Sequence, residues 1–165
     1  MQVVSTPVTV ATGCGILTSA VAAGIGTSLS VIGIPTILNT GAPTDVMLRQ
    51  WRFQFLRGRS FMPIVGTLNA ATYLFIAYNY YTIGLEWRGF AAAGFSTFSL
   101  VPFTLIFIMG TNNKLLAACS SSDRKEKTMS DATATALIKR WGELNVVRQL
   151  VPMIGTGLAL WNLLG

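Results

Sequence analysis

Long apolar runs are the feature that most limits how this chain can fold. A helix needs about 20 predominantly apolar residues to cross about 30 Å of hydrocarbon. Four runs approach or exceed that length, at about Val8–Ile34, Phe61–Tyr81, Phe90–Met109 and Val146–Leu164. Only 11% of the 165 residues are charged, whereas a soluble domain averages about 25%. We therefore expect an all-α integral membrane four-helix bundle, with residues 1–165 forming a single four-span transmembrane domain.

Basic side chains gather in the connection between the first and second runs and in the connection between the third and fourth. They are Arg49, Arg52, Arg57 and Arg59, then Lys114, Arg124, Lys125, Lys127, Lys139, Arg140 and Arg148. Four spans place both connections on one side, and the positive-inside rule makes that side cytosolic. Both termini then face the lumen or the exterior, and we expect an internal membrane, the endoplasmic reticulum. Because topology accounts for the net charge of +6, membrane lipid is an expected partner and nucleic acid is not.

The connections themselves contain helix signals and helix breakers. Residues 46–57 alternate aromatic and basic side chains, which predicts a short interfacial helix that residues 58–60 interrupt. Residues 120–130 are small and charged, which predicts a loop before another short helix that opens at Asp131. Pro35 is expected to end or kink the first run, and Pro102 to bend the third.

The composition excludes several kinds of active site. The chain has no histidine, so a His-ligated metal centre and a Ser–His–Asp triad are both excluded. Cys14 and Cys119 fall on predicted opposite sides of the membrane and are not expected to pair. The sequence contains neither a Walker loop nor a dinucleotide-binding fingerprint. We expect no metal site.

Polar side chains collect at one predicted membrane interface, where the apolar runs end. The third run is followed by Asn112, Asn113 and Lys114, the fourth begins near Trp141, Asn145 and Arg148, and the first connection adds Arg49, Trp51, Arg57 and Arg59. An amide in a low-dielectric environment must find hydrogen-bond partners, so these groups are either hydrated helix ends or the lining of a binding site. Amides and cations beside tryptophan rings suit a flat, acidic, oxygen-rich molecule, because a cation lowers the pKa of a phenol or enol.

Three other features each have two interpretations. Asn69 lies inside the second run, where it either bonds a neighbouring helix or contacts a ligand. The glycine-rich first run either packs closely against another helix or leaves room for a flat ligand, and the packing could be within or between subunits of a homo-oligomer. Glu143, the one acidic residue near the proposed cluster, is either a base or an ion-pair partner of Arg140 or Arg148.

Three segments of the sequence resemble one known family. They are PTILNTGAP with the RQW and RG that follow it, then VPFTLIFIMGTNNKL, then RWGELNVVRQLVP. Together they resemble the small membrane proteins of the fungal anthrone oxygenase family. The resemblance spans nearly the whole chain and is strongest over residues 102–116 and 140–152.

The resemblance implies a reaction and a set of site residues. The reaction is oxidation of an aromatic polyketide anthrone to an anthraquinone, with dioxygen as co-substrate and without flavin or metal. The matching positions are Trp51, Asn112, Asn113, Trp141, Asn145 and Arg148. On this basis Asn112, Asn113 and Arg148 are expected to be catalytic, holding the enolate oxygens, while Trp51, Arg57, Asn69, Trp141 and Asn145 are expected to bind substrate.

Other functions use the same features. An anion-holding site could direct a cyclisation or isomerisation of a similar intermediate. A non-catalytic scaffold or lipid-binding protein would use the Asn and Arg side chains to satisfy helix ends and bind headgroups. A transporter fits less well, because the runs show no obvious inverted repeat or pair of broken helices.

Overall fold

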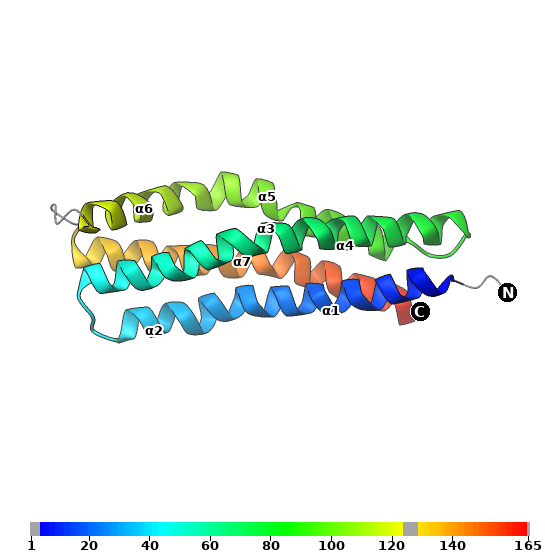
Figure 1. The fold of residues 1–165 in the computed structure, drawn as a ribbon, viewed down its shortest axis with the longest axis horizontal. Helices are drawn as coiled ribbons and strands as arrows, with labels where there is room; N and C mark the ends of the chain where they lie inside the picture. Colours follow the sequence, from blue (N-terminus) through cyan, green and yellow to red (C-terminus); the bar gives the residue numbers. More distant parts are fainter. Residues whose placement is uncertain (1–3, 124–128, 165) are drawn as a thin grey trace. The chain divides into compact units, whose positions relative to one another are not determined.

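A computed structural model describes residues 4–123 and 129–164. Within these residues the chain is all-α and has four helical runs (Figure 1). The first comprises α1 (Thr6–Ser28), the π-helical turn η1 (Leu29–Gly33) and α2 (Ile34–Asn39), and the second is α3 (Thr44–Thr82). The third comprises α4 (Arg88–Phe98), α5 (Leu100–Phe103), the π-helical turn η2 (Thr104–Ile108) and α6 (Met109–Asp123), and the fourth is α7 (Asp131–Leu164).

The helices are longer than the apolar runs, and two predictions about the connections are wrong. Residues 46–57 do not form a separate interfacial helix but are the beginning of α3, which continues through Gly58. The helix that opens at Asp131 is likewise the beginning of α7. One glycine inside a helix costs only about 1 kcal/mol, so Gly58 alone does not interrupt a helix that extends on both sides of it.

The predicted loop at residues 120–130 is also shorter than expected. Residues 120–123 complete α6, and α7 begins at Asp131 after the hydroxyl of Ser130 accepts a hydrogen bond from the backbone N–H of Thr133. Ser130 is thus the side chain that caps this helix. Residues 124–128, with the basic residues Arg124, Lys125 and Lys127, lie outside the described part of the chain.

The prolines distort the helical runs but do not end them. Pro35 lies in the first turn of α2, directly after η1, and because the helical run is continuous there, the proline leaves the preceding turn one hydrogen bond short. The run continues to Asn39. Pro102 lies in α5, between an irregular turn at Ser99 and the π-helical turn η2. The prediction that Pro102 disturbs the third run agrees with this interruption.

The chain divides into two compact units. Unit 1 comprises Met1–Gly24, Met62–Val101 and Gln149–Gly165, and unit 2 comprises Ile25–Phe61 and Pro102–Arg148. The core of unit 1 contains Tyr73, Ile76 and Phe90. The core of unit 2 contains Trp51 and Trp141 among aliphatic side chains.

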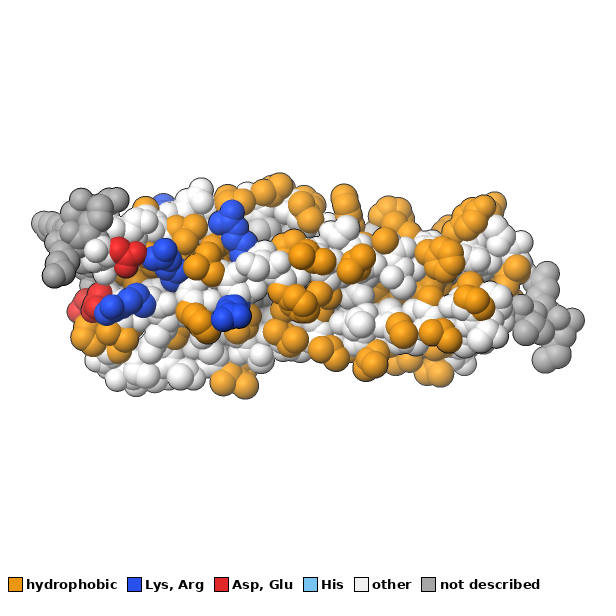
Figure 2. All heavy atoms as spheres, viewed as in Figure 1, with side chains coloured by type: hydrophobic (Ala, Val, Ile, Leu, Met, Phe, Trp, Pro, Cys, Tyr) orange, Lys and Arg blue, Asp and Glu red, His pale blue; other side chains and the backbone are white. Residues whose placement is uncertain are grey.

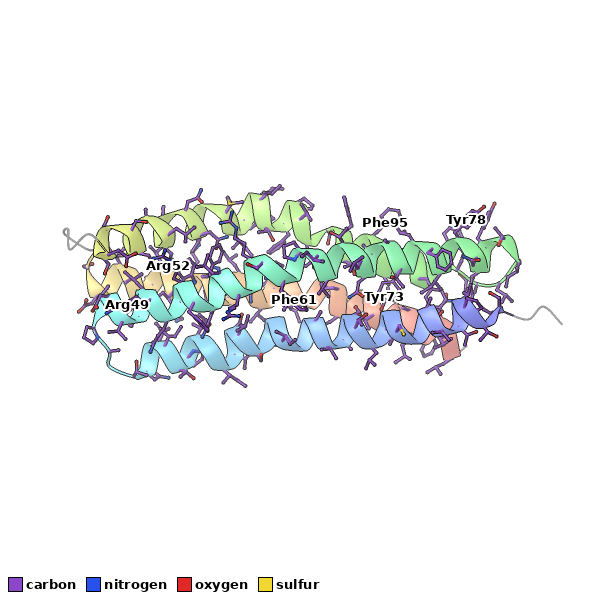
Figure 3. The ribbon with its side chains drawn as sticks, viewed as in Figure 1. Arg49, Arg52, Phe61, Tyr73, Tyr78 and Phe95 are labelled. Atoms are coloured by element: carbon purple, nitrogen blue, oxygen red, sulfur yellow. The ribbon has the colours of Figure 1, made fainter. Side chains whose placement is uncertain are left out.

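Polar side chains link the helices of unit 1. The hydroxyl of Thr18 donates to Asn69 Oδ1 at 2.7 Å, and the hydroxyl of Tyr73 donates to the carbonyl of Gly15 at 3.2 Å (Figure 3). Asn69 thus bonds a neighbouring helix, as the first interpretation of this residue expects. Such bonds satisfy polar groups that an apolar helical interior would otherwise leave unpaired.

Three helical runs are long and apolar enough to cross a membrane, namely Thr6–Asn39, Thr44–Thr82 and Arg88–Asp123, among the residues that the structure describes. Large apolar side chains of unit 1 are exposed, including Tyr78 at 67% and Phe95 at 66% (Figure 3). On the face shown in Figure 2, charged side chains gather over segments of unit 2, whereas hydrophobic side chains cover the segments of unit 1. These surfaces are typical of a membrane protein. The fourth span, in α7, stays a prediction.

Two glycines of α7 test how closely the helices of unit 1 pack. A Cβ at Gly155 would overlap the hydroxyl of Ser96 and lie 3.0 Å from Ala93 Cα, whereas a Cβ at Gly157 would meet no described atom within 4 Å. We expect Gly155→Ala to lower the free energy of unfolding by about 1–3 kcal/mol through overpacking. Gly157→Ala, the matched control, should leave stability unchanged or slightly raised, because alanine favours helix. Thermal unfolding in detergent measures both; equal midpoints for the two variants would contradict the close packing.

Candidate functional site

The core of unit 2 is built around two tryptophans from different helices. Trp51 on α3 is fully buried, and its ring stacks on Phe55 of the next turn with centroids 5.0 Å apart. Trp141 on α7 meets Trp51 edge to face, at a centroid distance of 6.0 Å and an interplanar angle of 89°. The edge-to-face pair is favourable because the positive ring edge of one tryptophan faces the negative ring face of the other. Stacked rings are favourable when they are offset.

Trp141 forms a hydrogen bond with the side-chain amide of Asn112, one of the predicted site residues. Its indole Nε1 donates to Asn112 Oδ1 at 2.9 Å, and both side chains are buried. Asn112 lies on α6, one turn after the buried Ile108. This bond satisfies a donor and an acceptor that the apolar interior would otherwise penalise by about 1–3 kcal/mol.

Asn145 follows Trp141 by one turn of α7 and is 1% exposed. Its amide nitrogen donates to the carbonyl of Gly26 at 3.0 Å and to the hydroxyl of Ser30 at 2.7 Å. Ser30 belongs to η1. These bonds fix the amide plane, since both of its donors are directed at the first helical run.

Arg148 follows on the same face of α7 and is partly buried. Its Nη1 donates to the hydroxyl of Thr104 at 3.5 Å. No carboxylate among the described residues forms an ion pair with it. A partly buried cation that lacks a counter-ion favours the binding of an anion.

Four buried side-chain atoms complete the arrangement, and we call them the polar quartet. They are Trp51 Nε1, Gln54 Oε1, Asn145 Oδ1 and Arg148 Nε, none of which has a hydrogen-bond partner among residues 4–123 and 129–164. All four belong to unit 2. Two are donors and two are acceptors, so a molecule that reached all four would need both acceptor and donor groups.

The structure does not bring every predicted site residue to this core. Asn113 is exposed on α6, because neighbouring residues point about 100° apart around a helix. Arg57 is exposed, with its guanidinium 5.3 Å from the ring centroid of Phe53. Asn69 belongs to unit 1. Glu143 is exposed and has no ion-pair partner in the described part of the chain.

The arginines of the first connection have other partners. Arg49 pairs with Asp45 on the same helix, and Arg52 pairs with Asp123 of α6 at 2.6 Å (Figure 3). These exposed pairs contribute little stability. No group of three or more His, Cys, Asp or Glu side chains that could hold a metal is found among the residues that the structure describes.

Comparison with known proteins assigns the family. The model of the anthrone oxygenase family matches residues 51–158. The chain belongs to the anthrone oxygenase family. The matched region begins at Trp51 and contains all four residues of the polar quartet.

Curated relatives of the anthrone oxygenase family cover most of the chain. It is 31% identical to "Monooxygenase hypC" of Dothistroma septosporum over 88% of this chain and 78% of the relative. It is 27% identical to "Noranthrone monooxygenase" of Aspergillus flavus, over 91% and 71%, and 30% identical to "Anthrone oxygenase dmxR16" of Cryptosporiopsis sp., over 88% and 81%. No solved structure matches the chain.

The bond between Trp141 and Asn112 gives a test of the core. Trp141→Phe removes the donor and leaves Asn112 Oδ1 buried, so the free energy of unfolding should fall by about 1–3 kcal/mol. Trp161→Phe is the matched control, because Trp161 is 79% exposed. In the double variant Asn112→Leu/Trp141→Phe, stability should partly recover, since neither polar partner is then left alone. Thermal unfolding that shows the same loss for Trp141→Phe and Trp161→Phe would contradict the buried bond.

Proposed function

We propose that this protein is a membrane-embedded enzyme that oxidises an aromatic polyketide anthrone to an anthraquinone with dioxygen. Membership of the family makes it an anthrone oxygenase-like monooxygenase, and relatives are named anthrone oxygenase and noranthrone monooxygenase. The polar quartet beside the paired tryptophans is the observation that supports a site for such a molecule. An anthrone is flat, apolar over most of its area and rich in oxygen at its edges.

The donors of the polar quartet suit the charge that develops in this reaction. The methylene carbon opposite the carbonyl of an anthrone is acidic, because its carbanion is an enolate with the charge on the former carbonyl oxygen. Arg148 Nε and Trp51 Nε1 are the two donors, and we assign them to that oxygen. Asn112, bonded to Trp141, holds the Trp141 ring against the flat substrate. Preorganised donors of this kind contribute several kcal/mol to the stabilisation of an oxyanion.

Dioxygen then reacts with the enolate itself. The enolate transfers one electron to dioxygen, and the resulting radical and superoxide combine to a peroxide anion. This anion takes up the proton that the methylene carbon released, which gives a hydroperoxide at that carbon. Loss of the remaining hydrogen from that carbon, with cleavage of the O–O bond, gives the quinone carbonyl and water. One dioxygen is consumed for each quinone formed, and the electrons come from the substrate, so we propose that neither flavin nor metal takes part.

We further propose a four-span bundle in an internal membrane, the endoplasmic reticulum, with both termini on the luminal side. Three helical runs have the length and apolar character for spans, and α7 provides the fourth. The basic residues of α3, such as Arg57 and Arg59, then lie on the cytosolic side. An apolar anthrone dissolves in the bilayer, so a site within lipid-facing helices receives it there, and membrane lipid is the surrounding partner. A homo-oligomer would be compatible with this arrangement.

Arg148 is the residue whose replacement should affect turnover most. Arg148→Gln removes the positive charge that faces the enolate, and we expect kcat to fall by about 10²–10³-fold, as for the loss of one oxyanion donor. The control is Arg88→Gln, because Arg88 is exposed at the beginning of α4 and belongs to unit 1. Quinone absorbance during aerobic incubation with emodin anthrone measures both, and equal rates for wild type and Arg148→Gln would contradict the assignment.

The proposed chemistry also predicts that dioxygen is required and that a metal is not. Detergent-purified protein treated with a chelator and then freed of small molecules should retain its full rate, and oxygen uptake should equal quinone formation. Loss of the rate on chelation, restored by one added metal, would show that a metal takes part. Consumption of the anthrone without oxygen uptake would instead indicate a cyclase or isomerase. Binding without turnover would favour a scaffold.

A further inference from the structure

We propose that Gln54 determines substrate specificity by accepting a hydrogen bond from a phenolic hydroxyl remote from the anthrone carbonyl. The proposal rests on the proposed function, and it adds the class of substrate, namely anthrones with a free hydroxyl at that position. The sequence offered no signal for Gln54 beyond its spacing from Trp51. Its assignment comes from its place in the polar quartet.

Gln54 lies three residues after Trp51 on α3, and residues with this spacing share one face of a helix. Trp51 Nε1 and Gln54 Oε1 are both buried members of the polar quartet. The same face of α3 therefore presents a donor and, about one turn later, an acceptor. An oxyanion and a phenolic hydroxyl on one flat molecule complement this order.

Gly33 of η1 fixes the position of the Gln54 amide. A Cβ at Gly33 would lie 2.9 Å from Gln54 Nε2, 3.0 Å from Oε1 and 3.2 Å from Cδ. The amide thus packs directly against backbone in the π-helical turn that also carries Ser30, the partner of Asn145. Because any larger residue at position 33 would displace the amide, the glycine is needed to hold the acceptor where it is.

The hydroxyl that Gln54 binds must be free to donate. A hydroxyl next to the anthrone carbonyl already donates to that carbonyl, or to the enolate oxygen that replaces it. A hydroxyl on the far side of the ring has no such internal partner. Without it, Gln54 Oε1 stays buried and unpaired in the complex, and sites built to bind a hydroxyl strongly reject analogues that lack one.

Two anthrones that differ in this group test the proposal. Emodin anthrone carries the remote hydroxyl, and chrysophanol anthrone lacks it while keeping the two hydroxyls beside the carbonyl. We expect wild type to favour emodin anthrone in kcat/KM by about 10–100-fold, a modest part of the discrimination that hydroxyl recognition can reach. Gln54→Leu should lose about that factor on emodin anthrone and little or nothing on chrysophanol anthrone.

Each result has a distinct meaning. An equal loss of kcat/KM on both substrates in Gln54→Leu would show that Gln54 only supports the fold. Equal kcat/KM of wild type for both substrates would show that the remote hydroxyl is not recognised. Either result overturns the proposal. If wild type accelerates neither oxidation, the proposed function fails as well. That outcome is distinguishable because it appears before any variant is made.

Gly33→Ala gives a second test that leaves Gln54 in place. The new Cβ meets the end of a flexible side chain, so the fold should survive while the amide moves. The control is Gly24→Ala on the same helical run, where a Cβ would have no described atom within 4 Å. Gly33→Ala should reduce the preference for emodin anthrone and Gly24→Ala should not; an unchanged preference in Gly33→Ala would overturn the role of the Gln54 amide.

Discussion

Polar atoms buried among apolar helices must find hydrogen-bond partners, and this constraint shapes the whole structure. In unit 1, Thr18 satisfies Asn69. In unit 2, Trp141 satisfies Asn112, and Ser30 accepts from Asn145. Each bond joins different helices, so it also fixes how those helices pack. The polar quartet stands out against this background, because its four atoms are buried in unit 2 and have no hydrogen-bond partner among the described residues.

Long continuous helices keep the site residues in place. On α7, Trp141, Asn145 and Arg148 follow one another at helical spacing, and on α3, Trp51 and Gln54 do the same. At the N-terminal ends of these two helices, the hydroxyl of Thr44 on α3 donates to the carboxylate of Asp131 on α7. Side chains held by rigid elements need little rearrangement when charge develops on a substrate, which is the condition for electrostatic catalysis. The family match over residues 51–158 covers all of these site residues.

The sequence predicted the all-α class, because apolar runs of membrane length are a strong signal. It also indicated Trp51, Asn112, Trp141, Asn145 and Arg148, all of which lie in unit 2, while their roles in a site stay predictions. Helix ends were predicted poorly, since Gly58 and residues 120–123 are weak breakers: one glycine inside a helix costs about 1 kcal/mol, and a serine costs less. Gln54 was missed, because no sequence pattern shows whether a buried amide oxygen has a partner. Asn113 follows Asn112 in the sequence but points elsewhere, and that difference appears only once the helix phase is known.

Stabilisation of the anthrone enolate by Arg148 and Trp51 is tested most directly by absorbance spectra recorded without oxygen. The enolate of an anthrone absorbs at longer wavelength than the ketone, and without oxygen it accumulates instead of reacting. At a pH below the pKa of the free anthrone, protein in excess over emodin anthrone should convert the ketone spectrum into that of the enolate. Oxygen admitted afterwards should then replace the enolate band with that of the quinone. A bound anthrone that keeps the ketone spectrum would contradict an anion-stabilising site.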